Sequence, residues 1–132
     1  MYLVDTSVWL DFFRGRRNEA VRRFDDIIEQ RVPFGISGII YQEVLQGAAS
    51  EEEFSRLAAY LGTQRFYQLR DSVESYRHAA GIYFRCRRQG VTIRSSIDCL
   101  VAQIAIEHDI SLLHNDQDYV RIASVVPELK LA

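Results

Sequence analysis

The sequence predicts an α/β domain with three layers, in which helices flank a short, parallel central sheet. Short apolar runs alternate along the chain with longer amphipathic segments, which is the pattern of strands alternating with helices. No two runs are joined by a hairpin turn motif, so we expect parallel strands connected through helices. The length of 132 residues predicts a single domain over residues 1–132.

In the first half of the chain, turn and cap residues separate the expected elements. These are strands over residues 1–4 and 34–37 and helices over residues 8–13, 18–30, 38–47 and 51–61. The first strand ends at Asp-Thr-Ser, whose side chains favour helix N-caps. Gly15 closes the first helix and Pro33 follows the second. The second helix is amphipathic, and its apolar face carries Val21, Phe24, Ile27 and Ile28.

The second half repeats this alternation. The expected elements are strands over residues 66–69, 110–113 and 125–131, the last at the sheet edge, and helices over residues 72–88, 95–105 and 117–123. Gly90 is expected to end the first of these helices. Its predicted apolar side carries Tyr76, Ala79, Ala80, Tyr83 and Cys86. The helix over residues 95–105 is apolar nearly all round, so it is expected to be buried against the sheet.

Composition and charge exclude several classes of protein. The chain has 16 basic and 18 acidic residues, a net charge of −2, which excludes a basic protein that coats nucleic acid. Lys130 is the only lysine, so the basic residues are nearly all arginines, which suit bidentate phosphate contacts. The two cysteines lack metal-type spacing, the start lacks a signal-peptide pattern, and no uncharged stretch reaches the roughly 20 residues that span a bilayer. We therefore expect a cytoplasmic protein without a membrane partner.

Acidic residues gather where the predicted strands end or the following helices begin. They are Asp5, Glu43, Asp98, Asp116 and Asp118. Ligands of parallel α/β sheets bind outside the carboxyl ends of the strands, so these acids are expected to meet there. Their charges would repel one another without a cation. Carboxylates without His or Cys partners favour Mg²⁺ or Mn²⁺, and this set predicts metal-assisted phosphoryl hydrolysis.

Each acid also has a simpler interpretation. Asp5 and Asp116 are placed to cap the helices that follow them. Ser95 and Asp98 match a capping box. Glu43 is otherwise an exposed helical glutamate, and Asp118 a solvated acid at a helix start. The joint placement of the five, rather than any one of them, carries the metal hypothesis.

Four segments in order resemble the PIN-domain family and, within it, the VapC-type ribonuclease toxins. They are residues 5–15 (DTSVWLDFFRG), Ile36-Ser37 with residues 43–47 (EVLQG), residues 97–102 (IDCLVA) with Ala105, and residues 112–119 (LLHNDQDY). Together they cover essentially the whole chain. The resemblance implies a PIN-like fold and a Mg²⁺- or Mn²⁺-dependent endoribonuclease that cleaves RNA. It also implies a homodimer and a small VapB-like antitoxin that occludes the site.

Position by position, the resemblance assigns the catalytic, metal-binding acids to Asp5, Glu43, Asp98 and Asp116. Asp118 matches an additional acid found in some members, and Thr6 and Ser7 match hydroxyls near the metal.

Two positions depart from the family pattern. His114 stands where many relatives carry Thr or Ser, and it is either a general acid beside the carboxylates or a packed, hydrogen-bonded histidine. Tyr119 replaces a common Phe, a substitution expected to be conservative.

RNA contacts are expected from two arginine clusters. On the helix over residues 72–88, Arg77, Arg85 and Arg88 share a polar face with His78. The second cluster, Arg14, Arg16 and Arg17, lies near Asp5 in sequence. The alternative is that these arginines only form a solvated helix face and do not contact RNA.

Two aromatic residues of the first helix also have two interpretations. Trp9 and Phe13 either contact an antitoxin or fill the core.

Other functions fit less well. A HAD-like phosphatase needs an acid two residues after the first Asp and a lysine near the site, whereas position 7 is Ser and Lys130 is terminal. A non-catalytic PIN-like binding module typically loses site acids, and this chain retains all of them.

The net charge of the chain changes sign when the five site acids are left out of the count. The remaining 13 acidic and 16 basic residues make the rest of the molecule mildly basic.

Overall fold

A computed structural model describes residues 1–132, which form one four-stranded sheet and seven helices. The strands are β1 (Tyr2–Val4), β2 (Phe34–Ile36), β3 (Arg65–Phe66) and β4 (Ser111–Leu113). The helices are α1 (Thr6–Phe13), α2 (Glu19–Glu29), α3 (Gly38–Gln46), α4 (Glu51–Leu61), α5 (Glu74–Arg88), α6 (Ser96–Glu107) and α7 (Gln117–Val125). All strand pairs are parallel, in the order β3-β2-β1-β4, which confirms the predicted sheet.

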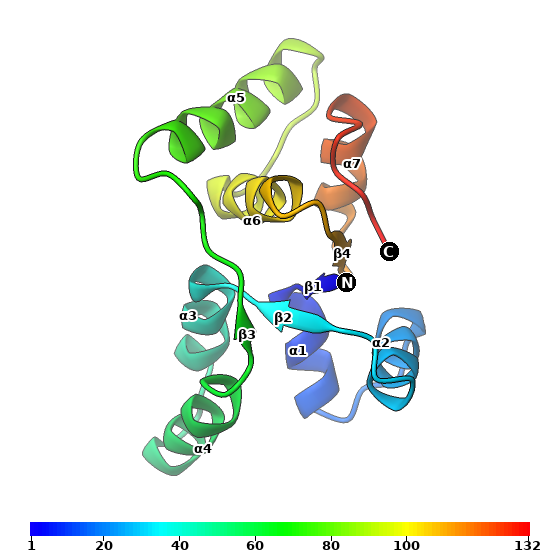
Figure 1. The fold of residues 1–132 in the computed structure, drawn as a ribbon, viewed down its shortest axis with the longest axis vertical. Helices are drawn as coiled ribbons and strands as arrows, with labels where there is room; N and C mark the ends of the chain where they lie inside the picture. The colour runs from blue at the N-terminus through cyan, green and yellow to red at the C-terminus, as the bar shows by residue number, and fades with distance from the viewer.

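Two groups of helices enclose this sheet and make the predicted three layers. Helix α1 contacts α2 and α3, and α3 contacts α4, whereas α5, α6 and α7 contact each other. Figure 1 shows the first group below the strands and the second group above them, with the two chain termini close together. None of the helices is both long and apolar enough to cross a lipid bilayer.

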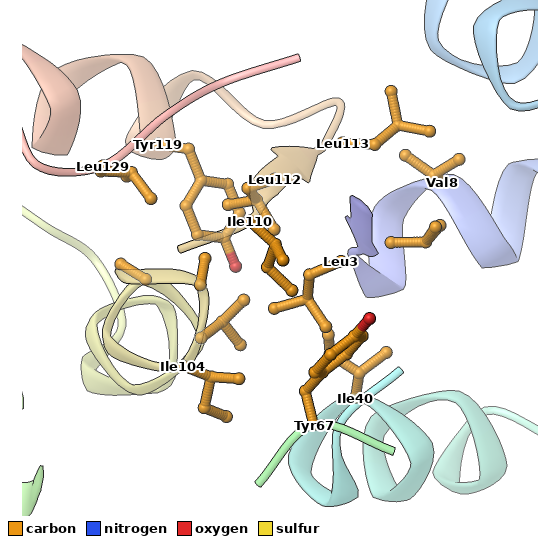
Figure 2. Close-up of a cluster of buried hydrophobic side chains, with 14 of the residues drawn as sticks. Leu3, Val8, Ile40, Tyr67, Ile104, Ile110, Leu112, Leu113, Tyr119 and Leu129 are labelled. Atoms are coloured by element: carbon orange, nitrogen blue, oxygen red, sulfur yellow. The ribbon is translucent and has the colours of Figure 1, made fainter. Parts of the chain in front are cut away.

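The core lies on both faces of the central strands. Leu3 and Val4 of β1 and Leu112 of β4 are completely buried. Figure 2 shows Leu3 and Leu112 between Ile104 of α6 on one side and Val8 of α1 on the other. Burial on both faces explains why these strands read as uninterrupted apolar runs rather than alternating ones.

Gly35 is required where β2 meets β3. A Cβ atom at this position would lie 2.5 Å from the carbonyl oxygen of Arg65 and 2.7 Å from the Tyr67 ring. Any side chain there would push β3 away from the sheet. The glycine therefore allows the short third strand to pair at all.

An aromatic cluster fixes α1 beneath the sheet. Trp9 is completely buried, and its ring packs edge-on against Phe24 of α2 at 5.0 Å and in a stack with Phe13 at 5.7 Å between ring centroids. The indole Nε1 has no hydrogen-bond partner. Of the two interpretations left open for these aromatics, Trp9 belongs to the core, whereas Phe13 is 38% exposed.

The predicted C-terminal edge strand is wrong. Helix α7 continues to Val125, two residues past its expected end, and the Leu129 amide then donates to the carbonyl of Val126 in a turn. Pro127 lies in this turn and has no amide to offer a ladder. Only a single bridge, from Leu131 to Leu112, joins this segment to the sheet.

The predicted apolar face of α5 is partly wrong. Its buried residues are Ser75, Ala79, Ile82 and Cys86, whereas Tyr76 is 53% exposed and Tyr83 is 37% exposed. The buried stripe follows positions i, i+4, i+7 and i+11 and is made mostly of small side chains, which allow α5 to pack closely against α6. Hydrophobicity alone favoured the tyrosines, but the small residues make the contact.

Candidate active site

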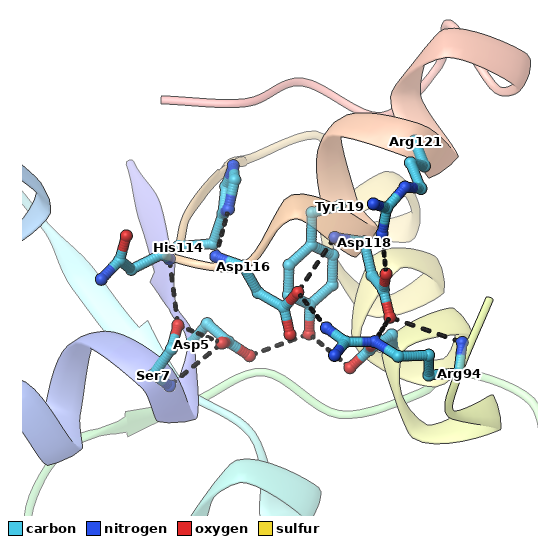
Figure 3. Close-up of polar contacts among 10 residues, drawn as sticks. Asp5, Ser7, Arg94, His114, Asp116, Asp118, Tyr119 and Arg121 are labelled. Carbon is cyan, nitrogen blue, oxygen red and sulfur yellow. Dashed lines mark hydrogen bonds and ion pairs between the residues drawn. The ribbon is translucent and has the colours of Figure 1, made fainter. Parts of the chain in front are cut away.

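The five acids come together at the carboxyl ends of β1 and β4, beside α3 and α6. Figure 3 shows Asp5, Asp116 and Asp118 of this group. Asp5 directly follows β1, and Asp116 follows β4 after a two-residue loop. Asp98 lies in the first turn of α6, and Glu43 in the middle of α3. Oxygen atoms of Asp98, Asp116 and Asp118 lie within 4.8 Å of one another.

Asp98 is the electrostatic centre of this cluster. Partial burial, followed by the nearby charges of Asp116, Asp5 and Asp118 in that order, raises its pKa to about 7. The capping interpretation does not account for the side chain, because the Ser95 hydroxyl accepts from the amide of Ile97 and the Asp98 carboxylate faces Tyr119 instead. At neutral pH this carboxyl therefore binds a proton more readily than an ordinary aspartate does.

Tyr119 joins two of the acids through its hydroxyl. The hydroxyl donates to Oδ1 of Asp5 at 2.8 Å and lies 3.3 Å from Oδ1 of Asp98. The side chain is 1% exposed, and burial followed by the charges of Asp5 and Asp98 raises the pKa of Tyr119 well above 10. The hydroxyl thus stays protonated as a donor, and the replacement of the family's Phe by Tyr adds a polar contact inside the site.

We predict that Tyr119→Phe lowers the stability of the metal-free protein. The variant keeps the ring but leaves Asp5 and Asp98 without the shared donor, and a hydrogen bond to a charged group contributes about 1.5–3 kcal/mol. Urea unfolding in EDTA at pH 8 measures the change. Tyr67→Phe is a matched control because its hydroxyl contacts only the sulfur of Met1. Equal losses in the two variants would contradict this role for Tyr119.

A chain of polar contacts fixes the β4–α7 loop that carries Asp116. The Ser7 hydroxyl donates to Oδ2 of Asp5 at 2.6 Å and accepts from the amide of Asn115 at 3.0 Å. The Asn115 side chain then donates to Asp11 on α1. As predicted, the Asp5 and Asp116 side chains also cap α1 and α7, so capping and site roles coexist in the same residues.

Glu43 faces the same cluster from α3. Its Oε1 accepts from the Thr6 hydroxyl at 2.8 Å, and Oε2 makes no hydrogen bond within the protein. Burial and the charge of Asp5 raise its pKa, which the hydrogen bond from Thr6 partly offsets. Thr6 and Ser7 thus each donate to a different site carboxylate.

Asp118 is bound by two arginines. Its Oδ2 accepts from Nε of Arg94 at 3.1 Å, and its Oδ1 from Nη1 of Arg121 at 2.6 Å. Burial raises the pKa of Asp118, but these contacts outweigh it and hold the pKa below its usual value. Asp118 is 1% exposed, which is contrary to the simpler interpretation of a solvated acid.

Sequence reasoning missed Arg94. Its Nη2 also lies 3.3 Å from Oδ1 of Asp116, so one guanidinium contacts two of the five acids. The residue precedes α6 in a segment without regular structure. The only feature of the sequence that points to Arg94 is that it lies four residues before Asp98. No helix or strand periodicity sets it apart from the other arginines.

His114 is a neutral, hydrogen-bonded residue beside the site. Its Nδ1 accepts from the amide of Asp116 at 3.2 Å, and its ring packs against Tyr119. Burial lowers its pKa, and the charges of Asp5 and Asp116 oppose this only in part. The geometry favours the packed interpretation, in which the ring supports the loop.

Two of the predicted RNA-contacting arginines, Arg77 and Arg85, pair with acids outside the site. Arg77 pairs with Glu74 on the same helix, and Arg85 pairs with Glu128 beyond α7. The hollow beside them is lined by Gln103 of α6, which is more than one helical turn along from Asp98.

The carboxylates fit a small divalent cation. Opposite oxygens around an octahedral Mg²⁺ lie about 4.2 Å apart, close to the spacing of the acids here. Five acids gather here, and only two arginines, Arg94 and Arg121, form ion pairs with them, so the cluster carries an excess of negative charge. Hard oxygen donors with excess negative charge are the donor set that Mg²⁺ and Mn²⁺ prefer.

Comparison with known families agrees with this geometry. The sequence profile of the PIN domain matches residues 2–125. The chain belongs to the PIN-domain family. This PIN domain is 34% identical over 128 residues to a VapC ribonuclease of Mycobacterium bovis, a match that covers 95% of the chain and 93% of the relative. It is also 30% identical over 124 residues to ribonuclease VapC51 of Mycobacterium tuberculosis, covering 94% of the chain and 86% of the relative.

Solved structures show the same PIN fold. The match to VapBC2 from Rickettsia felis, bound to a promoter DNA fragment, has a TM-score of 0.75 at 19% identity and covers 99% of this chain and 96% of that one. The match to FitAcB from Neisseria gonorrhoeae has a TM-score of 0.72 at 20% identity, with coverage of 100% and 97%.

Proposed function

We propose that residues 1–132 act as a single PIN domain that hydrolyses RNA phosphodiester bonds as a Mg²⁺- or Mn²⁺-dependent endoribonuclease toxin. The observation that carries this proposal is the meeting of Asp5 and Asp116, which follow the neighbouring strands β1 and β4, with Asp98 of α6. The Tyr119 hydroxyl contacts both Asp5 and Asp98, and oxygens of Asp98 and Asp116 lie within 4.8 Å of each other. Relatives that match nearly the whole chain are ribonucleases by name, which supports RNA as the substrate.

The residues that would hold the cation are Asp5, Asp98 and Asp116, with Glu43 facing the same space. When bound, the cation would supply Lewis-acid chemistry to the scissile phosphate and lower the pKa of a water. Tyr119 and Ser7 fix the two oxygens of Asp5 by donating hydrogen bonds to them. Oε2 of Glu43, which has no partner in the protein, is free to accept a proton from the attacking water.

The partners follow from the same assignment. We propose an RNA substrate, a VapB-like antitoxin that covers the acidic site, a homodimer and a cytoplasmic location. Free, buried thiols at Cys86 and Cys99 are consistent with a reducing compartment.

Contacts between the RNA backbone and Arg14, Arg77, Arg85 and Arg88 stay a prediction. Charge reversal at Arg85 and Arg88, followed by RNA binding measured across a salt series, would test it.

The other activities gain no support from the site. A HAD-like phosphatase would need a lysine beside Asp5, but the ammonium of Lys130 pairs with Asp109 at 2.5 Å. The residue two positions after Asp5 is Ser7, whose hydroxyl donates to Asp5. A binding module that has lost catalysis would lack acids, whereas all five are present, and carboxylate oxygens of Asp98, Asp116 and Asp118 lie within 4.8 Å of one another.

Cleavage of RNA by the purified, antitoxin-free protein tests the proposal. We expect cleavage with Mg²⁺ or Mn²⁺, none with EDTA, and recovery when excess Mg²⁺ is added back. Glu43→Gln should retain the fold and lose rate, because Gln cannot accept the proton. Equal cleavage with metal and with EDTA would indicate a contaminating nuclease and reject the proposal.

A further inference from the structure

The pair of arginines around Asp118 is not explained by metal binding. Both oxygens of the Asp118 carboxylate already accept hydrogen bonds, one from Arg94 and one from Arg121. The backbone amide of Arg94 also lies 3.4 Å from the same Oδ2 that its Nε contacts. Asp118 thus binds both the main chain and the side chain of Arg94.

Arg94 is fixed at its base and free at its tip. Its side chain is 71% exposed although Nε and Nη2 contact Asp118 and Asp116. The remaining terminal nitrogen, Nη1, makes no hydrogen bond within the protein. A guanidinium with a free donor therefore lies at the rim of the carboxylate cluster, where Asp118 positions it (Figure 3).

The positive charge of Arg94 at the edge of the acidic cluster would help a phosphodiester to approach it. A phosphodiester that approaches several carboxylates is repelled by them, so a fixed positive charge at their edge lowers the cost of approach. The guanidinium of Arg94 suits a phosphate because it carries a permanent charge and its free Nη1 can donate a charge-assisted hydrogen bond. Arg121 is less suited to this task, since its contact with Asp118 uses a terminal nitrogen and no second site acid contacts it.

We propose that Arg94 binds a backbone phosphate of the RNA at the cleavage site, and that Asp118 is the positioning residue for Arg94 and acts on the reaction through it. This inference rests on the proposed function for the nature of the substrate. It separates Asp118 from Asp5, Asp98 and Asp116, whose carboxylates face the cation.

RNA binding without cleavage tests the role of Arg94. The affinity of a fluorescent single-stranded RNA is measured by anisotropy in EDTA between 50 and 200 mM salt, conditions set by the steep salt dependence of phosphate contacts. For Arg94→Gln we expect about tenfold weaker binding, as for loss of one charge-assisted contact, and a salt slope shallower by about 0.7. Arg56→Gln makes the same charge change on the exposed surface of α4 and should bind like wild type. Unchanged affinity and slope in Arg94→Gln would overturn the proposal.

Asp118→Asn tests the positioning role. We expect this variant to lose RNA affinity to the same extent as Arg94→Gln, with no further loss in the double variant, because both changes remove one interaction. Mn²⁺ affinity, followed by electron paramagnetic resonance, should change by the same factor in Asp118→Asn as in Arg94→Gln, because Asp118 acts through Arg94, which also contacts Asp116. A loss of Mn²⁺ affinity in Asp118→Asn about tenfold larger than in Arg94→Gln would make Asp118 a ligand and overturn its positioning role.

Two readouts keep this inference separate from the proposed function. Fluorescence of Trp9 and circular dichroism establish that each variant is folded. Wild type that binds RNA but does not cleave it with Mg²⁺ or Mn²⁺ rejects the proposed function and leaves the binding test of Arg94 intact. Wild type that binds no RNA rejects both.

Discussion

Asp98→Asn should abolish RNA cleavage while making the metal-free protein more stable above pH 7. The carboxylate is central among the acids, so its loss removes a ligand of the cation. Metal assistance contributes several kcal/mol to such reactions, which corresponds to a fall in rate of about 10³-fold. The amide has the same shape but no charge, so it removes the cost of burying a charge and the repulsion by neighbouring acids, which together raise the pKa of Asp98.

The pH dependence of this stability gain follows from that pKa. The folded-state pKa of about 7 lies above the ordinary value of 3.8, so the folded protein binds a proton that the unfolded chain releases. The resulting stability is fully present below pH 4 and is lost as the pH rises through 7. We expect Asp98→Asn to exceed wild type by on the order of 1–2 kcal/mol at pH 8, after allowance for partial exposure, and to approach it near pH 4.

Urea unfolding in EDTA at pH 5 and pH 8 measures the stability change, and RNA cleavage in Mg²⁺ measures the activity. Asp109→Asn is the matched control, because its carboxylate is exposed and its φ of 51° suits Asn as well as Asp. The control should cleave RNA at the wild-type rate. Cleavage of RNA by Asp98→Asn at the wild-type rate would show that Asp98 is not part of the active site.

Trp9→Ala should have the largest effect on stability. Trp9 is completely buried, and its ring lies near those of Phe12, Phe13, Phe24, Phe34 and Tyr60. Truncating a buried aromatic to alanine costs about 3–5 kcal/mol, a large part of the 5–15 kcal/mol that stabilises a typical domain. Circular dichroism follows urea unfolding, since the only tryptophan is lost.

Trp9→Phe is the control for this change. It keeps an aromatic ring and removes the indole Nε1, which has no hydrogen-bond partner. We expect a loss clearly smaller than that of Trp9→Ala. Unfolding free energies within about 1 kcal/mol of wild type for Trp9→Ala would show that α1 is not anchored by the aromatic cluster.

Residues whose role follows from chain order could be predicted from the sequence. Asp5 and Asp116 follow apolar strands, and parallel strands bring their carboxyl ends to one edge, so their meeting follows from topology. The same reasoning predicted the helix that presents Asp98. It failed at residues 125–131, where Pro127 removes a ladder donor and a turn replaces the strand.

Residues whose role depends on side-chain contacts across the fold could not be predicted. Asp118 and Arg94 are 24 positions apart, and only the packing of α7 beside α6 brings them together. The hydroxyl of Tyr119 meets Asp5 across 114 positions. No periodicity in the sequence reveals these pairs. The sequence therefore predicted Asp118 as a metal-site acid or a solvated acid, without its two arginine partners, and Tyr119 as a simple replacement for Phe.

The position of Mn²⁺ in crystals grown with that ion tests the central claim most directly. Anomalous scattering measured at the manganese absorption edge locates the ion without assumptions about its ligands. We predict a peak among the carboxylates of Asp5, Asp98 and Asp116, and none at this place in crystals of Asp98→Asn. A protein that cleaves RNA with Mn²⁺ but shows no peak between these carboxylates would contradict the assignment of this cluster as the metal site.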